Sequence, residues 1–305
     1  MQIGKHTLKN NDAWGIEMQC LAAGVLLLWS VPAMCADTVA TAATPPSAAA
    51  SSPHEGDTAN IRLHRLRHLD ARLNTDPADL HAQCRYESEI STRPPQKHLA
   101  LTFDDGPEPV QTEYILEVLR RHGARATFFM IGEQVKKDPE LLAKVLADGH
   151  HLVANHSWDH PNFHAISVAE QLQEVEATEQ ALAQNMPHKL FRYPYGNSTC
   201  ETNAYLHKQG YQIIGWHIDS CDWAFDKTGS VDAREAATCA VLPQFQSDYV
   251  GHVIASMRAH NGGIVLMHEI HPNTLKKLDE ILQQAVADGF VFDALDAPEF
   301  DSSMR

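Results

Sequence analysis

The stretch HLALTFDDGP, residues 98–107, joins an apolar run of strand length to two adjacent aspartates and a Gly-Pro break. Asp, Gly and Pro are ordinary turn residues, so the two charges could simply be solvated as the chain leaves the strand. The alternative is that Asp104 and Asp105 deliver a catalytic base and a metal ligand to one end of a sheet. The rest of the sequence decides between these interpretations.

Apolar runs of strand length recur after Pro95 and alternate with segments of helical periodicity. Strands are predicted at residues 98–103, 126–132, 151–157, 190–196, 211–219, 263–269 and 290–296. Helices are predicted at 112–123, 138–149, 167–184 and 274–289, and three of these end in the glycine that favours a left-handed stop. This alternation indicates a parallel sheet covered by helices, and seven repeats indicate a single barrel close to the eight-stranded βα kind.

Ionisable side chains follow five of the predicted strands at their carboxyl ends, where βα barrels hold their chemistry. The residues are Asp104 and Asp105, His156 and His160, Arg192 and Tyr195, Asp219 and Asp222, and His268. Five separate strand ends of this kind are hard to explain as solvated loops. The pattern favours a functional site.

The segment NHSWDHPNFH, residues 155–164, contains His156, His160 and His164, each four residues apart. Residues four apart can converge on one ion because they lie on one face of a turn. Two histidines and one carboxylate, with an open position for water, are typical of hydrolytic zinc sites. The aspartates at a neighbouring strand end could supply that carboxylate.

Five short motifs occur in one order along the chain: TFDDGP, HSWDH, RYPYG, DSCDW and LMH, which begin at residues 102, 156, 192, 219 and 266. In this order and spacing the chain, over about residues 97–296, resembles the polysaccharide deacetylases, the NodB-homology domain of carbohydrate esterase family four. The resemblance implies a distorted (β/α)7-type barrel. It also implies a metal-dependent hydrolase that removes N-acetyl groups from an N-acetylglucosamine-containing polysaccharide, with peptidoglycan as the first expectation.

The resemblance assigns metal-binding and base-catalysis roles to five residues of the first three motifs. Asp105, His156 and His160 are expected to bind one divalent metal ion. Zinc suits two histidines and one aspartate best, with cobalt, nickel or manganese as alternatives. Asp104 is expected to be the catalytic base, and Arg192 its charged partner.

The remaining assignments concern the leaving group and the acetyl group of the substrate. His268 is implied as the general acid that protonates the departing amine, with Asp222 orienting it. The backbone N–H of Tyr195 is expected to bind the acetyl oxygen. Trp223 and Leu266 are expected to form the slot for the acetyl methyl, although ordinary core packing is the alternative.

Four further residues stand outside this assignment. His164 is left out of the ligand set by the match, and Tyr193 stands where the family usually has proline, which could reshape the sugar groove. The run MHEIH suggests a metalloprotease, but the HExxH motif needs two residues between Glu and the second His. Glu269 and His271 have one between them, which excludes that class.

Three other functions remain open from the sequence. Some family members remove O-acetyl groups from xylan, and a catalytically silent glycan-binding protein could use the same scaffold. A metal phosphoesterase would also use Asp and His but usually brings a second metal. A nucleic-acid partner is excluded because the formal net charge is −15 and no basic stripe is present.

The N-terminal region indicates export to the periplasm or medium. Residues 1–36 are predicted to be a signal peptide, 37–59 a disordered linker, 60–96 a helical extension and 97–305 the barrel. An internal start at Met18 or an uncleaved anchor is the alternative; after cleavage no stable membrane span is expected.

Four cysteines remain after the predicted cleavage: Cys84, Cys200, Cys221 and Cys239. Two disulfides fit an exported chain, and sequence leaves three connectivities open. The pair Cys221–Cys239 is favoured because these residues are close in sequence. Buried free thiols are the alternative.

Overall fold

The computed structural model describes residues 84–304 except 89, 91 and 148. The predicted signal peptide, the linker and residues 60–83 of the predicted helical extension lie outside the described residues, and the domain boundaries stay predictions. Within the described part, no helix is long and apolar enough to cross a membrane.

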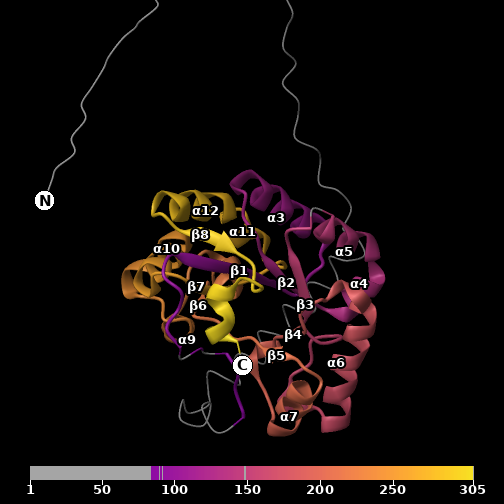
Figure 1. Cartoon of the computed structure of the whole chain (residues 1–305). Coiled ribbons are helices and arrows are strands. Elements are labelled where there is room, and N and C mark those ends of the chain that lie inside the picture. The colour runs from indigo at the N-terminus through magenta and orange to yellow at the C-terminus, as the bar shows by residue number, and fades with distance from the viewer. Residues whose placement is uncertain (1–83, 89, 91, 148, 305) are drawn as a thin grey trace, which may run out of the picture. The chain divides into compact units, whose positions relative to one another are not determined.

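A sheet of parallel strands lies at the centre of the described residues, and helices surround it (Figure 1). The strands are β1 (His98–Asp104), β2 (Thr127–Met130), β3 (Leu152–Asn155), β4 (Leu190–Phe191), β5 (Gln212–Ile213), β6 (Ile218–Asp219), β7 (Gly263–His268) and β8 (Val291–Asp293). Their order is β5-β4-β3-β2-β1-β7-β6, and β8 pairs with β1 beside this path.

The described helices connect and cover these strands. They are α3 (Pro109–His122), α4 (Gly132–Lys137), α5 (Pro139–Leu146), α6 (Val168–Leu182), α7 (Cys200–Lys208), α8 (Asp222–Thr228), α9 (Ala233–Thr238), α10 (Tyr249–His260), α11 (Pro272–Leu275) and α12 (Leu278–Ala287). Short 3-10 turns include η1 (Phe163–Ala165), η2 (Ala183–Asn185), η3 (Pro194–Gly196), η4 (Pro243–Phe245) and η5 (Pro298–Ser303). The predicted glycine stops are confirmed, because Gly123, Gly149 and Gly289 all have positive φ.

The predicted strand at 211–219 is two strands, and the chain passes between the two ends of the curled sheet at the break. Its first half, β5, pairs with β4, and its second half, β6, pairs with β7, so one segment joins both ends of the strand path. Between them the Trp216 N–H donates to the Ser88 carbonyl at 2.7 Å. A Cβ on Gly215 would lie 2.2 Å from that same oxygen, so only glycine permits the approach. The barrel prediction is confirmed as a curled, partly open barrel.

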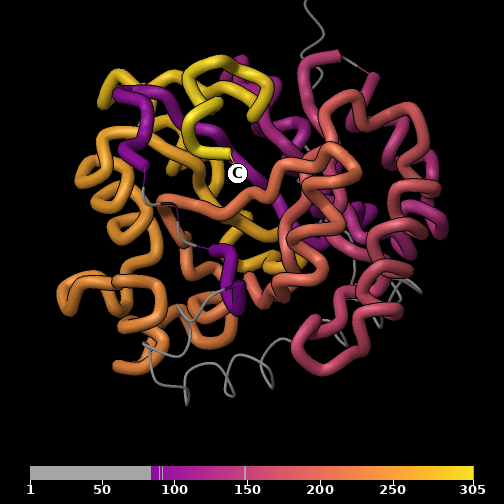
Figure 2. Tube along the Cα trace, turned by 60° about the horizontal axis from the view of Figure 1, so that its bottom comes forward, coloured from indigo at the N-terminus to yellow at the C-terminus, as the bar shows by residue number. Residues whose placement is uncertain are grey.

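Alternate residues of β1 face two different apolar layers. Leu99, Leu101 and Phe103 pack outward with the α3 residues that face the sheet, whereas Ala100 packs inward with residues such as Leu266. The inward row continues through Thr102 to Asp104, because strand side chains alternate between faces. Figure 2 shows the C-terminal segment beside the start of β1, where β8 pairs with it.

Candidate metal and catalytic site

The two adjacent aspartates at the end of β1 approach the same histidine. Strand alternation alone would turn Asp105 outward, away from Asp104. Its φ of 77° lies in the left-handed region and breaks the alternation. Consequently Asp104 Oδ2 and Asp105 Oδ1 lie 3.6 and 3.4 Å from Nε2 of His156, and both aspartates are buried.

Asp105, His156 and His160 form a compact triangle of donor atoms. Asp105 Oδ1 lies 3.4 Å from His156 Nε2 and 3.5 Å from His160 Nε2. Ligands bound tetrahedrally at zinc distances lie about 3.3–3.5 Å apart, so these spacings fit one ion at the centre. All three residues are buried.

The hydrogen bond on the far side of His156 supports this fit. Its Nδ1 lies 2.8 Å from the carbonyl oxygen of Arg192, which can only accept, so Nδ1 carries the proton. In neutral His156, Nε2 then presents its lone pair to two carboxylates at separations longer than a hydrogen bond. Such an arrangement is repulsive without a cation between the groups, and a metal-ligating histidine usually donates its other ring N–H to a carbonyl or carboxylate oxygen.

The N-terminus of α4 shapes the loop that carries both histidines. Gly132 N–H donates to the Ser157 carbonyl at 3.0 Å, and Glu133 N–H donates to the Trp158 carbonyl at 2.9 Å. Ser157 has a φ of 69° and His160 a φ of 63°, so the loop turns twice through the left-handed region. These turns bring His160 back beside His156, with ring centroids 5.0 Å apart.

Glu174 on α6 secures the same loop from the other side. Its Oε2 accepts the N–H groups of Trp158 at 2.8 Å and Asp159 at 3.1 Å. Burial raises the pKa of Glu174 to about 7, while the two N–H donors act in the opposite direction. The ligand loop is therefore held by two helices.

His164 lies apart from this cluster. It is in η1 with an exposed side chain, and its Nε2 lies 2.8 and 3.0 Å from the carbonyl oxygens of Arg85 and Ser198. The regular spacing of the three histidines therefore does not give three ligands, since the loop is not helical.

Arg192 is fully buried at the end of β4 and fixes Asp104. Its Nη1 donates to Asp104 Oδ1 at 2.8 Å and to the Thr102 hydroxyl at 2.7 Å. Its other nitrogens donate to the carbonyls of Ile214 and Gly215. Burial lowers the pKa of Arg192 from its usual value and Asp104 raises it, but a guanidinium stays charged in proteins.

The RYPYG turn directs its two tyrosines to different places. Tyr195 has a φ of 60° inside η3, and its ring packs edge-on against His160 with centroids 4.6 Å apart. Tyr193 is buried and donates to Asn203 Oδ1 at 2.7 Å, with its ring against Phe163 and Phe191. The residue that departs from the family pattern thus fills the core, and Tyr195 lies at the site.

His268 and Asp222 form a second buried pair next to Asp104. His268 ends β7 and is the register partner of Asp104 across the sheet. Asp222 Oδ1 lies 2.6 Å from His268 Nδ1, and Asp222 Oδ2 accepts the His268 backbone N–H at 2.7 Å. His271 lies close enough to Asp222 and His268 for the three residues to suggest a second metal cluster. However, a 2.6 Å separation is a hydrogen bond and is too short for two ligands of one ion.

The two residues expected to hold the acetyl methyl lie in different surroundings. Leu266 is buried in the inner apolar layer, as its core alternative predicts. Trp223 is partly exposed, its N–H donates to Asp222 Oδ1 at 2.8 Å, and it packs on the cluster that includes Phe225. Only Trp223 of the two has appreciable exposed surface.

Glu269 is a site residue that the motifs did not assign. It is fully buried, its backbone N–H donates to the Asp104 carbonyl at 2.9 Å, and the Thr112 hydroxyl donates to its carboxylate. A Cβ on Gly106 would lie 1.8 Å from its Oε1, so that glycine makes room for it. Burial raises the pKa of Glu269 to about 8, which keeps it largely protonated at neutral pH. Its place directly after a strand-end histidine was the available signal.

Comparison with known proteins shows which family the chain belongs to. The sequence model of the polysaccharide deacetylase family matches residues 91–214. A chitooligosaccharide deacetylase of Bradyrhizobium sp. is 35% identical over 175 residues, 56% of this chain and 70% of the relative. The chain belongs to the polysaccharide deacetylase family. The resemblance inferred from the five motifs is confirmed, and the family match includes the region of Asp105, His156 and His160.

Two peptidoglycan deacetylases are also similar to this chain. The peptidoglycan-N-acetylglucosamine deacetylase PgdA of Listeria monocytogenes is 32% identical over 210 residues, 68% of this chain. The match spans 40% of the length of that relative. A crystal structure of another peptidoglycan N-acetylglucosamine deacetylase superposes with a TM-score of 0.56 at 27% identity, covering 69% of this chain and 91% of that one.

Proposed function

We propose that the protein is a metal-dependent hydrolase that removes N-acetyl groups from an N-acetylglucosamine-containing polysaccharide, with peptidoglycan as the preferred substrate. The observation that carries this is the triangle of Asp105, His156 and His160, with the Arg192-bound Asp104 at its edge. Relatives named as peptidoglycan and chitooligosaccharide deacetylases support the substrate class.

Asp105, His156 and His160 would hold one divalent ion, and this ligand set favours zinc over cobalt, nickel or manganese. A bound zinc supplies Lewis-acid polarisation and acidifies a water molecule. The three side chains are suited to this because all are buried and the His156 ring is oriented by the Arg192 carbonyl.

Asp104 is proposed as the base that takes a proton from the attacking water. Arg192 Nη1 donates to Oδ1 at 2.8 Å, which orients the carboxylate and leaves Oδ2 directed toward His156. A base must be both ionised and aimed at the proton it removes. The buried guanidinium fixes the direction of the Asp104 carboxylate.

His268 is proposed as the acid that protonates the leaving amine, and Asp222 as the residue that orients it. An amine leaves poorly without a proton, so a positioned donor is needed. Tyr195 is proposed to donate its backbone N–H to the acetyl oxygen, a contact worth about 3 kcal/mol in comparable sites. Trp223 and Leu266 are proposed to border the acetyl methyl.

Export of the protein is part of the proposal. The described residues contain the disulfides Cys84–Cys200 and Cys221–Cys239, and such bonds persist in oxidising compartments. The second pair is the one favoured from sequence. A periplasmic or secreted location would place the site next to its polymer.

Acetate release from purified peptidoglycan, chitin oligosaccharides and acetylated xylan tests this function. We expect release from peptidoglycan that stops with a chelator and returns with zinc. Fastest release from xylan would instead identify an O-acetyl esterase, and glycan binding without release a silent binding protein. His156→Ala combined with His160→Ala should remove both metal and activity, whereas His164→Ala is the matched control and should keep both.

A further inference from the structure

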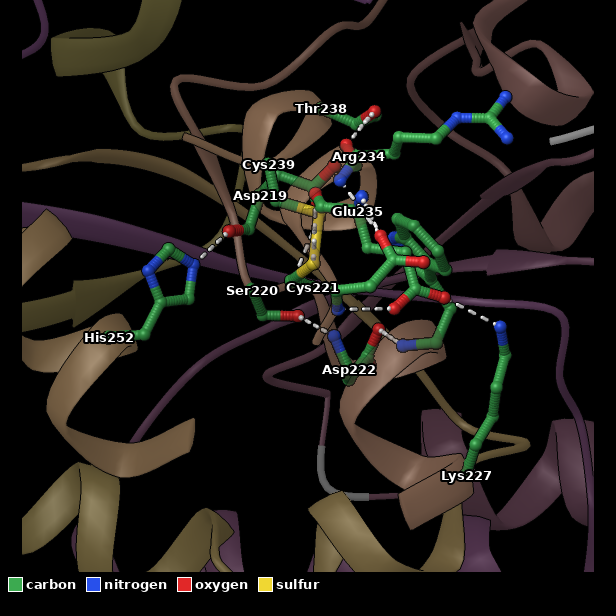
Figure 3. The surroundings of a disulfide bond; sticks show 12 residues. Asp219, Ser220, Cys221, Asp222, Lys227, Arg234, Glu235, Thr238, Cys239 and His252 are labelled. Carbon is green, nitrogen blue, oxygen red and sulfur yellow. Dashed lines mark hydrogen bonds and ion pairs between the residues drawn. A yellow bond between two sulfur atoms is a disulfide. The ribbon is translucent and has the colours of Figure 1, made fainter. Parts of the chain in front are cut away.

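We propose that the disulfide Cys221–Cys239 is a positioning element of the reaction, because it fixes the start of α8 so that Asp222 holds His268. This inference rests on the proposed function, in which His268 protonates the leaving amine. Cys221 directly precedes Asp222, and the bond connects it to Cys239 at the C-terminal end of α9 (Figure 3).

The backbone at Cys221 requires support from its surroundings. Cys221 is fully buried with a φ of 59°, a left-handed conformation that residues with a Cβ rarely adopt outside constrained sites. Its N–H donates to Asp219 Oδ1 at 2.8 Å, and the next N–H, of Asp222, points to the Ser220 hydroxyl at 3.4 Å. This turn determines where α8 begins.

The turn places the Asp222 carboxylate with little freedom. Oδ1 accepts the Trp223 N–H at 2.8 Å and lies 2.6 Å from His268 Nδ1, while Oδ2 accepts the His268 N–H at 2.7 Å. Asp222 directly follows Cys221, and its three partners are the Trp223 N–H and two nitrogens of His268 at the strand end. A small shift of Cys221 would therefore move the carboxylate away from the imidazole. Displacements of about 1 Å can cost about 100-fold in rate.

The α9 end of the disulfide is itself anchored. Cys239 belongs to a small apolar cluster separate from the two barrel layers, together with Val231, Ala236 and Phe225. Lys227 on α8 and Glu235 on α9 form an ion pair at 2.8 Å (Figure 3). The disulfide therefore joins Cys221, the residue before Asp222, to the packed end of α9 rather than to a loose loop.

The consequence is selective for the leaving group. Breaking the C–N bond of an acetamide requires a proton for the departing amine, whereas an aryl acetate loses a stable phenolate without one. A misplaced His268 should thus slow amide cleavage much more than aryl ester cleavage. General loss of structure at the metal site would slow both reactions alike.

The test is Cys221→Ser combined with Cys239→Ser, assayed as the zinc-loaded full chain on chitin oligosaccharide and on para-nitrophenyl acetate, counting only chelator-sensitive turnover. We expect kcat for deacetylation to fall about 10- to 100-fold with little change in KM, and aryl ester turnover to fall less than about threefold. His268→Ala and Asp222→Asn should show the same selective loss. Equal loss on both substrates would overturn the proposal.

Two further arms separate positioning from stability. Cys84→Ser combined with Cys200→Ser removes the other disulfide and should leave the ratio of the two rates unchanged. Adding the Cys221 and Cys239 changes to Asp222→Asn should cost less than about twofold more, since both act through one carboxylate. Full additivity would place the effect of the disulfide elsewhere.

If the serine pair does not fold, the bond is opened in the folded Cys84→Ser, Cys200→Ser protein with dithiothreitol. Two electrons and two protons pass to the sulfurs, giving two thiols and the cyclic oxidised reagent, and alkylation followed by mass measurement counts the thiols. The same selective loss, recovered on re-oxidation, is expected. An unaltered rate ratio in the reduced protein overturns the proposal, whereas an inactive wild-type enzyme would overturn the proposed function instead.

Discussion

Asp104 and Asp105 differ in role because of one backbone angle and one partner. The left-handed φ of Asp105 turns its carboxylate into the space between His156 and His160, while Asp104 continues the inward row of β1 and meets Arg192. Adjacent residues with the same chemistry can therefore serve as ligand and base. The distinction can be tested one side chain at a time.

Asp104→Asn should abolish deacetylation while the metal remains bound. Asparagine keeps the shape and can still accept from Arg192, but it cannot take a proton, and loss of a positioned base reduces rates by about 100- to 10,000-fold. Metal content by mass spectrometry and acetate release measure the two effects. Asp105→Asn is the matched comparison and should weaken metal binding. Near-normal turnover in the Asp104 variant would exclude it as the base.

Glu269 should make the metal-free protein less stable as pH rises. Its folded pKa of about 8 lies above the unfolded value near 4.5, so between these limits the folded state holds a proton that the unfolded state has lost. The contribution of Glu269 to the free energy of unfolding is fully present below about pH 4.5. It falls by at most about 1.4 kcal/mol per pH unit up to about pH 8.

Glu269→Gln removes that dependence because glutamine is neutral and of similar shape. Denaturant unfolding in chelator at pH 5 and pH 8 should show a smaller loss of stability in the variant than in the wild type. Parallel pH curves for the two proteins would show that Glu269 does not titrate in this range. Sequence alone could not predict this residue's state, because it depends on burial behind Gly106 and Thr112.

Two helices that carry none of the proposed ligands hold the loop that shapes the metal triangle. α4 supplies N–H donors to the loop after β3, and α6 supplies the Glu174 carboxylate. The ligand types and their strand ends could be predicted from the motifs. The loop's left-handed turns and its helical supports could not, because they arise from contacts between segments distant in sequence.

Glu174→Ala should weaken metal binding by about 10-fold, the lower end for loss of an outer support of a metal site. Two loop N–H groups would lose their acceptor, and His160 would no longer be held beside His156. Glu174→Gln keeps an acceptor oxygen and should retain most of the affinity. Competitive chelator titration measures both variants, and equal affinities in Ala and Gln would show that the hydrogen bonds are unimportant.

The elements themselves were predicted unevenly, and each miss has a local cause. Strands β1, β2, β3 and β7 lie within or almost within their predicted ranges, because they are continuous apolar runs buried on both faces. The run 211–219 reads as one strand, yet Gly215 lets residue 88 approach and divides it. Helices α4, α7, α8, α9 and α10 lie outside the predicted helical ranges, and α8 and α9 are short and pack on their own small cluster.

For the whole molecule, the segment at residues 84–90 connects the barrel to the chain before it. The Ser198 N–H donates to the Arg85 carbonyl at 3.1 Å, the Glu87 N–H to the Gly196 carbonyl at 2.9 Å, and the Trp216 N–H to the Ser88 carbonyl. The last of these bonds lies between β5 and β6, the two ends of the strand path. The curl of the sheet is therefore supported by residues from before the first strand, which strand periodicity cannot reveal.

Cys84–Cys200 holds this segment covalently and should be the larger contributor to global stability of the two disulfides. It spans 116 residues, compared with 18 for Cys221–Cys239. Chain entropy gives about 4–5 kcal/mol for the first and about 3 kcal/mol for the second. Urea unfolding of the two serine-pair variants should reproduce that order. The opposite order would mean that the short bond supports more of the fold than the α8–α9 region it joins, and its selective effect on amide cleavage would then need a global explanation.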